Sequence, residues 1–193
     1  MKKSTIILLA VIALVAIWGV SGYNGLVTAD ESVKTAWSQV ENQYQRRSDL
    51  IPNLVNTVKG YAAHESQTLE GVVAARAKAT QVSVDAENLT SESLAAYMSA
   101  QDEVGSALGR LMMIREAYPD LKANQNFIEL QAQLEGTENR IAVERNRFNE
   151  VARTFNTQIR KFPKSIIASL GGFEAKPYFE ANEGAEVAPV VEF

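Results

Sequence analysis

The chain has 193 residues, enough for one ordinary domain, and its formal net charge of −4 and pI near 5.2 give no reason to expect a nucleic-acid partner. The absence of cysteine excludes disulfides, thiol catalysis and thiolate metal sites. His64 is the only histidine, and one imidazole cannot build a multi-histidine zinc or iron site, so we expect no metal, no cofactor and no catalytic residue.

An apolar segment near the N-terminus predicts a membrane anchor. Every residue from Ile6 to Val20 is apolar or glycine, and the stretch without charge runs from Ser4 to Ala29. The strongly apolar part, residues 5–21, is close to the ~20 residues that span a bilayer core. We therefore expect an anchor over residues 1–22, a helical bundle over 23–163 and an irregular, flexible tail over 164–193.

A cleaved signal peptide is the competing interpretation of this segment, with Val20-Ser21-Gly22 as a small-residue cleavage site. A retained anchor is favoured because the apolar run is long for a signal peptide and the helical pattern begins directly after it. Lys2 and Lys3 precede the span, whereas Lys34 is the one basic residue in the next twenty. The positive-inside rule therefore predicts a cytoplasmic N-terminus and a bundle outside the cytoplasm.

The rest of the chain has the pattern of long helices. Good helix formers dominate between residues 24 and 161, Pro52 and Pro119 are the only prolines there, and no sustained polar–apolar alternation indicates strands. Three segments carry apolar residues at alternating steps of three and four, which is the seam of helices packed as in a coiled coil. The three series are Val33, Trp37, Val40, Tyr44, Ile51, Leu54, Val58, Tyr61; Leu94, Tyr97, Val104, Leu108, Leu111, Tyr118; and Phe127, Leu130, Leu134, Ile141, Phe148, Val151, Phe155, Phe162.

These patterns predict an all-α fold, in which an N-terminal transmembrane helix is followed by a long-helix antiparallel bundle of about four helices. The first helix is expected over residues 24–62, with a kink at Pro52 because proline removes a backbone hydrogen bond. The second is expected over 64–80. The third is capped by Thr90 with Ser93, or by Ser91 alone, and the fourth covers 121–162 after a turn at 118–120.

Arg47 is a charged residue within the otherwise apolar seam. It occupies a position of the first apolar series, so its guanidinium should be partly buried and must have a partner. Glu144 holds a seam position on the fourth helix, and Glu138 is nearby. The favoured interpretation is a structural polar cluster of Arg47, Glu138 and Glu144 that fixes the register of the bundle. An anion-binding or peptide-terminus site is the functional alternative, and a solvated arginine is the third.

Several strings resemble the LemA family of bacterial membrane proteins. The string Tyr44-Gln45-Arg46-Arg47-Ser48-Asp49-Leu50-Ile51-Pro52-Asn53-Leu54-Val55 is similar to the family signature. Further matches, in the family's order over about residues 23–180, are Glu65, Ala75-Arg76-Ala77, Tyr118-Pro119-Asp120-Leu121-Lys122-Ala123, Glu138-Asn139-Arg140-Ile141, Phe148-Asn149, Phe155-Asn156 and Pro177-Tyr178-Phe179.

The resemblance implies an N-terminal transmembrane helix, a mainly antiparallel helical bundle, and neither enzymatic activity nor a cofactor. It implies a bacterial protein, which we expect to cross the inner (cytoplasmic) membrane once. It also singles out motif residues to which no role can be given from the sequence: Arg46, Asp49, Pro52, Asn53, Asn139, Arg140 and Asn149.

Two functional hypotheses follow, besides a disfavoured enzyme for which no catalytic constellation is present. The first is a membrane-tethered scaffold or adaptor of the cell envelope that contacts the bilayer through its N-terminal helix and binds a protein partner or a second copy. The alternative is a membrane-remodelling protein whose helices touch lipid directly. Beyond Lys3, 17 basic residues stand against 23 acidic ones, which disfavours binding to anionic lipid.

Overall fold

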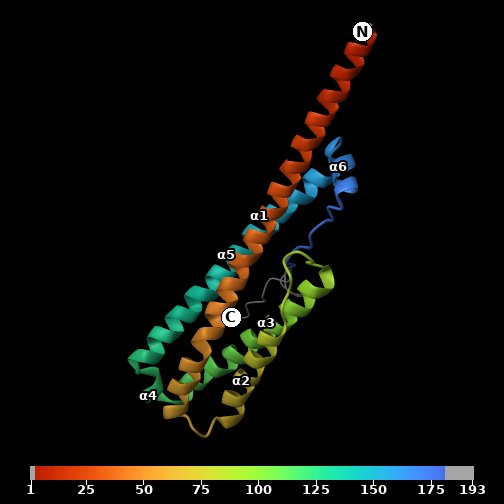
Figure 1. The fold of residues 1–193 in the computed structure, drawn as a ribbon. Coiled ribbons are helices and arrows are strands. Elements are labelled where there is room, and N and C mark those ends of the chain that lie inside the picture. Colours follow the sequence, from red (N-terminus) through yellow and green to blue (C-terminus); the bar gives the residue numbers. More distant parts are fainter. Residues whose placement is uncertain (1–2, 181–193) are drawn as a thin grey trace, which may run out of the picture.

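The computed structural model describes residues 3–180, and every regular element in that range is helical (Figure 1). No strand occurs among these residues, so the predicted all-α class is confirmed. Four principal helices carry the fold. A 3-10 turn over Arg115–Ala117 and one short helix join the third to the fourth, and a second short helix follows the fourth. In chain order they are α1 (Lys3–Tyr61), α2 (Ser66–Gln81), α3 (Ser91–Ile114), α4 (Pro119–Lys122), α5 (Gln125–Arg160) and α6 (Lys164–Gly171).

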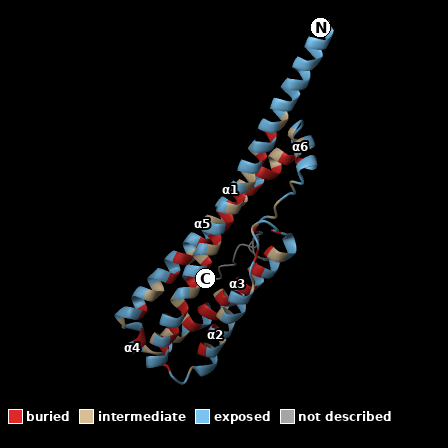
Figure 2. Cartoon of the chain, viewed as in Figure 1, coloured by how far each residue is buried: buried red, intermediate tan, exposed pale blue. Residues whose placement is uncertain are grey.

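Helix α1 passes without a break from an exposed apolar rod into the core of the bundle. Its 59 residues give a length of about 90 Å at 1.5 Å per residue. Residues 3–18 are exposed on every side, whereas one face is buried from Gly22 onward (Figure 2). The N-terminal part of α1 is long and apolar enough to cross a membrane. Pro52 lies inside the helix with its ring exposed, and the helix continues through it.

Helices α1 and α5 form one antiparallel pair, and α2 and α3 form a second that closes the lower half of the bundle (Figure 1). Trp37 on α1 packs against Phe148 on α5 with ring centroids 5.8 Å apart. Ten residues further along α1, Arg47 meets Glu138, which lies ten residues earlier on α5. Equal steps on both helices mean that the pair runs in constant register over this stretch.

The apolar interior consists of two clusters stacked along the bundle axis. The cluster nearer the apolar rod includes Trp37, Tyr44 and Phe148, and the distal cluster includes Ile51 and Phe127. Side chains cap two of the helices, because the first backbone N–H groups of a helix have no acceptors within it. The Thr90 side chain accepts a hydrogen bond from the Ser93 amide in a capping box on α3, and Asn124 caps α5 by accepting from the amide of Phe127.

The prediction of an irregular, flexible tail from residue 164 is wrong for residues 164–180. Residues 164–171 form α6, and residues 173–180 then run back along α5 in an extended conformation. The segment is fixed because Phe179 is only 6% exposed and stacks on Trp37, with ring centroids 5.9 Å apart. Residues 181–193 lie outside the described residues, so the expectation for them stays a prediction.

Two members of the predicted seam series are exposed. Tyr61 is the last residue of α1, and its hydroxyl accepts a hydrogen bond from Asn124. Phe162 follows the end of α5 and is 82% exposed. Both lie where a helix ends, so no facing helix covers them, although the spacing of the series includes them.

The two phenylalanines give a matched test of this packing. Phe179→Ala should destabilise the bundle by about 3–5 kcal/mol, because it removes a ring enclosed by Trp37 and Phe148. Phe162→Ala should change stability by less than about 0.5 kcal/mol, because its ring is exposed. Urea unfolding of the full chain in detergent micelles, followed by tryptophan fluorescence, measures both. Equal losses would contradict the docking of residues 173–180.

Candidate functional site

A polar layer separates the two apolar clusters at the middle of the bundle. Of the buried polar residues in the described part of the chain, Arg47, Gln101 and Thr137 lie in this layer. On α1 the layer falls between Tyr44 of one cluster and Ile51 of the other, and on α5 it falls between Ile141 and Leu134. On α3, Gln101 directly follows Ala100 of the distal cluster. The layer is therefore built by α1, α3 and α5 together.

Arg47 holds the layer together through the two ends of its guanidinium. Its Nη2 donates to the side-chain Oε1 of Gln101 at 2.6 Å and to the backbone carbonyl of the same residue at 2.9 Å. Its Nη1 donates to Glu138 Oε1 at 3.0 Å. The guanidinium carbon also lies 5.0 Å from the ring centre of Tyr44, a cation–π arrangement. A planar fork with several donors suits this task better than a lysine ammonium would.

The carboxylate of this ion pair is not itself buried. Glu138 is 43% exposed, whereas the Arg47 side chain is 5% exposed. The charge of Arg47 is thus compensated from the rim of the layer, and its desolvation is offset mainly by Gln101 and by Tyr44. Burial raises the pKa of the Tyr44 hydroxyl above its ordinary value, so this neighbour stays neutral near pH 7 and adds no second charge.

Glu144 does not join the cluster with Arg47 and Glu138. It lies six residues beyond Glu138 on α5, which corresponds to about 9 Å along the helix axis. In the observed register it stands level with Glu41, and its nearest cation is Arg147 on its own helix, at 3.9 Å. Position 144 belongs to the seam pattern, but the sequence does not give the register between α1 and α5, and the register selects Glu138.

A second polar construction clasps residues 176–179 to α5. The amide nitrogen of Asn156 donates to the Lys176 carbonyl, and its oxygen accepts from the Lys176 N–H, both at 2.8 Å. Two helical turns earlier, Asn149 makes the same pair of bonds to Phe179, again at 2.8 Å. Lys176 also pairs with Asp30 on α1 at 2.9 Å. The clasp therefore ties the C-terminal segment to both long helices.

The other motif residues lie on the surface. Arg46, Pro52 and Asn53 on α1 are exposed, as are Asn139 and Arg140 on α5. Asp49 is exposed as well and accepts a hydrogen bond from Gln45 at 2.7 Å. The structure therefore divides the motif into Asn149, which holds the C-terminal segment, and side chains that the interior does not use.

The sequence pattern did not identify Gln101 of the polar layer or Asn156 of the clasp as partners. Gln101 falls within the second apolar series, between Tyr97 and Val104, where an isolated amide could have been recognised as a partner for a buried charge. The seven-residue spacing of Asn149 and Asn156 puts both amides on one face of α5, but an extended segment as their partner carries no periodic signal.

The polar layer and the clasp provide fixed hydrogen bonds and charge compensation. An open pocket of about 390 Å³ lies beside the layer, and its lining includes Arg47, Arg76 and Tyr97. Arg76 donates to the Ser48 carbonyl at 2.9 Å, so it serves the contact between α1 and α2. No group of three or more potential metal ligands occurs among the residues described, and His64 is exposed in the turn between α1 and α2.

Comparison with known proteins places this fold in a family. The model of the LemA family matches residues 36–193. Magnetosome protein MamQ 2 of Paramagnetospirillum magneticum is 29% identical over 188 residues, covering 88% of this chain and 68% of that protein. MamQ of Magnetospirillum gryphiswaldense is 28% identical over 186 residues, with the same coverage. Protein LemA of Metamycoplasma hominis is 23% identical over 160 residues, covering 83% of this chain and 69% of that protein.

The asymmetry of the ion pair predicts unequal effects of removing its two members. Arg47→Ala should destabilise the bundle by about 2–4 kcal/mol, because it leaves the buried Gln101 side chain without its donor. Glu138→Gln should cost less than about 1 kcal/mol, because the carboxylate is half exposed. Urea titrations of both variants in the same micelles measure the difference. A loss near zero for Arg47→Ala would mean that the arginine is solvated and the layer is open.

Proposed function

The chain belongs to the LemA family, and we propose that it acts as a membrane-anchored scaffold or adaptor that binds a protein partner or a second copy of itself without turnover chemistry. The observation that carries the proposal is the continuity of α1. One helix supplies both the exposed apolar segment 3–20 and one side of the bundle core. Such a helix transmits the position of an anchor rigidly to the bundle, which a scaffold requires and a soluble-metabolite enzyme does not.

Surface features of the bundle support a binding role. An open groove of about 1410 Å³ runs between α2 and α3, where Gly71, Ala74 and Ala75 leave room beside Leu94 and Met98. A groove of this kind accepts a helix or an extended peptide. The exposed motif residues of α1 and α5 offer a second polar surface that the interior does not use.

Site-specific photo-crosslinking in cells tests the scaffold role. In separate variants, a photoreactive residue is placed at Ala95 in the groove and at Asn139 on the motif surface. A third variant carries it at Lys59, near the distal end of α1, for comparison. A defined crosslinked partner, or a crosslinked second copy, is expected at one of the first two positions. Unirradiated cells, and a chain lacking residues 3–22, serve as controls. No product at any position, together with loss of the wild-type phenotype in His64→Ala, would refute the proposal and reopen a catalytic or metal role.

The proposed setting is the bacterial inner membrane, crossed once, with the N-terminus in the cytoplasm and the bundle outside. Lys2 and Lys3 before the span, against Lys34 beside Asp30 and Glu31 after it, support this orientation. Protease added to intact spheroplasts is therefore expected to digest the bundle. A cytoplasmic protein assayed in the same samples controls for lysis. Digestion of the bundle only after lysis would reverse the orientation while leaving the anchor in place.

A further inference from the structure

We infer that α6 is a second membrane-contact element, which lies in the bilayer–water interface beside the exit of α1 and inserts Ile166 and Leu170, together with Phe162 from the turn before it, into the lipid. The inference rests on the proposed function, because it takes the N-terminal part of α1 as the anchor. It adds a lipid-binding surface that belongs to the bundle itself.

The outer face of α6 is apolar and unpacked. Ile166 and Leu170 lie four residues apart on α6 and are 51% and 85% exposed, and Phe162, in the turn before the helix, is 82% exposed. The opposite face is used by the protein, because Ala168 is buried and Ile167 contacts α1 at Gly22. Exposed side chains of this size on an eight-residue helix gain from leaving water.

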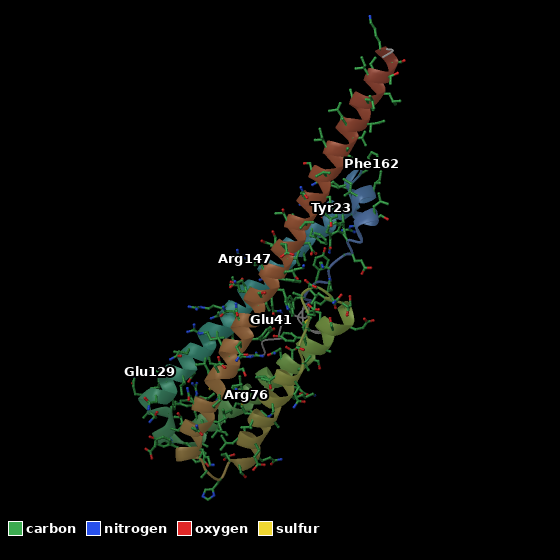
Figure 3. All side chains as sticks on the ribbon, in the orientation of Figure 1. Tyr23, Glu41, Arg76, Glu129, Arg147 and Phe162 are labelled. Carbon is green, nitrogen blue, oxygen red and sulfur yellow. The ribbon has the colours of Figure 1, made fainter. Side chains whose placement is uncertain are left out.

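The position of α6 along α1 coincides with the predicted bilayer surface. Gly22, which touches Ile167, is also the residue at which α1 changes from exposed to buried. Tyr23 packs its ring against Phe173, just after α6, with centroids 5.6 Å apart. No spacer separates the apolar rod from the bundle, so a bilayer around α1 must reach α6. Figure 3 shows Phe162 further toward the N-terminal end of α1 than Tyr23.

The length of the apolar segment leaves a gap that α6 can fill. Residues 5–21 span about 25 Å as a helix, whereas a bilayer core is about 30 Å thick. A short span is accommodated by thinning of the bilayer, snorkelling of flanking residues or oligomerisation, each at a modest cost in free energy. Helix α6 lies beside Gly22, at the end of the span, so the exposed apolar side chains on its outer face can cover bilayer core that residues 5–21 do not reach.

The charge near α6 fits phospholipid headgroups, although the chain as a whole is acidic. Residues 151–173 contain Arg153, Arg160, Lys161 and Lys164 and no acidic residue. Lys161 is exposed, and Lys164 is held by a hydrogen bond to Gln158 at 3.2 Å. A basic rim around an apolar face favours a lipid surface over a second copy of the same face, which would bring like charges together.

The absence of cysteine makes a direct depth measurement possible. Spin labels are attached to Leu170→Cys, to Leu14→Cys within the proposed span, and to Met113→Cys. Met113 is a matched control, because it is an apolar residue near the end of α3 that is 67% exposed. The full chain is reconstituted into vesicles of mixed zwitterionic and anionic phospholipid. Collision rates with oxygen, which enters lipid, are compared with those of a polar nickel complex, which stays in water.

The inference predicts that the Leu170 label is several-fold more accessible to oxygen than to nickel, as at Leu14, while the Met113 label shows the reverse. A Leu170 label that behaves like Met113, with Leu14 in lipid, overturns the role of α6 and leaves the anchor intact. A Leu14 label in water overturns the anchor itself. A Leu170 label shielded from both agents and broadened by a neighbouring spin identifies a second copy as the occupant, and also overturns the inference.

A charge variant tests the contribution of the basic rim. Lys161→Glu combined with Lys164→Glu should move the Leu170 label toward water in anionic vesicles and leave the Leu14 label unchanged. Both lysines lie outside the buried clusters, so the bundle is expected to stay folded. No movement of the Leu170 label would show that headgroup charge does not hold α6 at the surface.

Discussion

The antiparallel pairing of α1 with α5 is the interaction on which the other contacts depend. It buries Leu26, Trp37 and Val58 along α1, and α5 is the helix to which the C-terminal segment is clasped. Helix α2 packs on α1 and α3, α3 reaches α1 through Tyr97 and Gln101, and both helices complete the distal cluster. Because α1 also extends beyond the bundle as an apolar rod, its environment changes from exposed to buried at Gly22. A change in the α1–α5 register would therefore move the core and the clasp relative to the rod.

The polar layer crosses this pairing at the middle of the bundle. Apolar seams repeat every seven residues, so two such helices could slide by two turns and still bury comparable surface. Arg47 meets Glu138 of α5 and Gln101 of α3 in the observed register. A slip of α1 against α5 would separate the guanidinium from Glu138, and a slip against α3 would leave it without the Gln101 acceptors. An unpaired buried charge costs more than a paired one contributes. We interpret the layer as a device that selects one register, a role that requires neither a ligand nor a reaction.

The C-terminal segment connects this interior to the level at which α1 leaves the bundle. From α6 beside Gly22, the chain returns along α5, and Lys176 pairs with Asp30 before Phe179 enters the aromatic cluster around Trp37. The segment thus touches the exit point of α1 at one end and the middle of the core at the other. A force on α6 would reach the core through the Asn149 and Asn156 clasp, which is a physical route from α6 to the interior of the bundle.

The sequence by itself determined what depends on local periodicity and composition. The spacing of apolar residues predicted the long helices, and the seam position of Arg47 predicted its burial, because both follow from 3.6 residues per turn. The strings around residues 44–55 and 118–123 predicted the family. Tertiary structure alone decided the register that pairs Arg47 with Glu138 and leaves Glu144 apart, since helices of the same period can pair at several offsets. It also decided the path of residues 173–180, because an extended segment held by two asparagine side chains has no repeat to recognise.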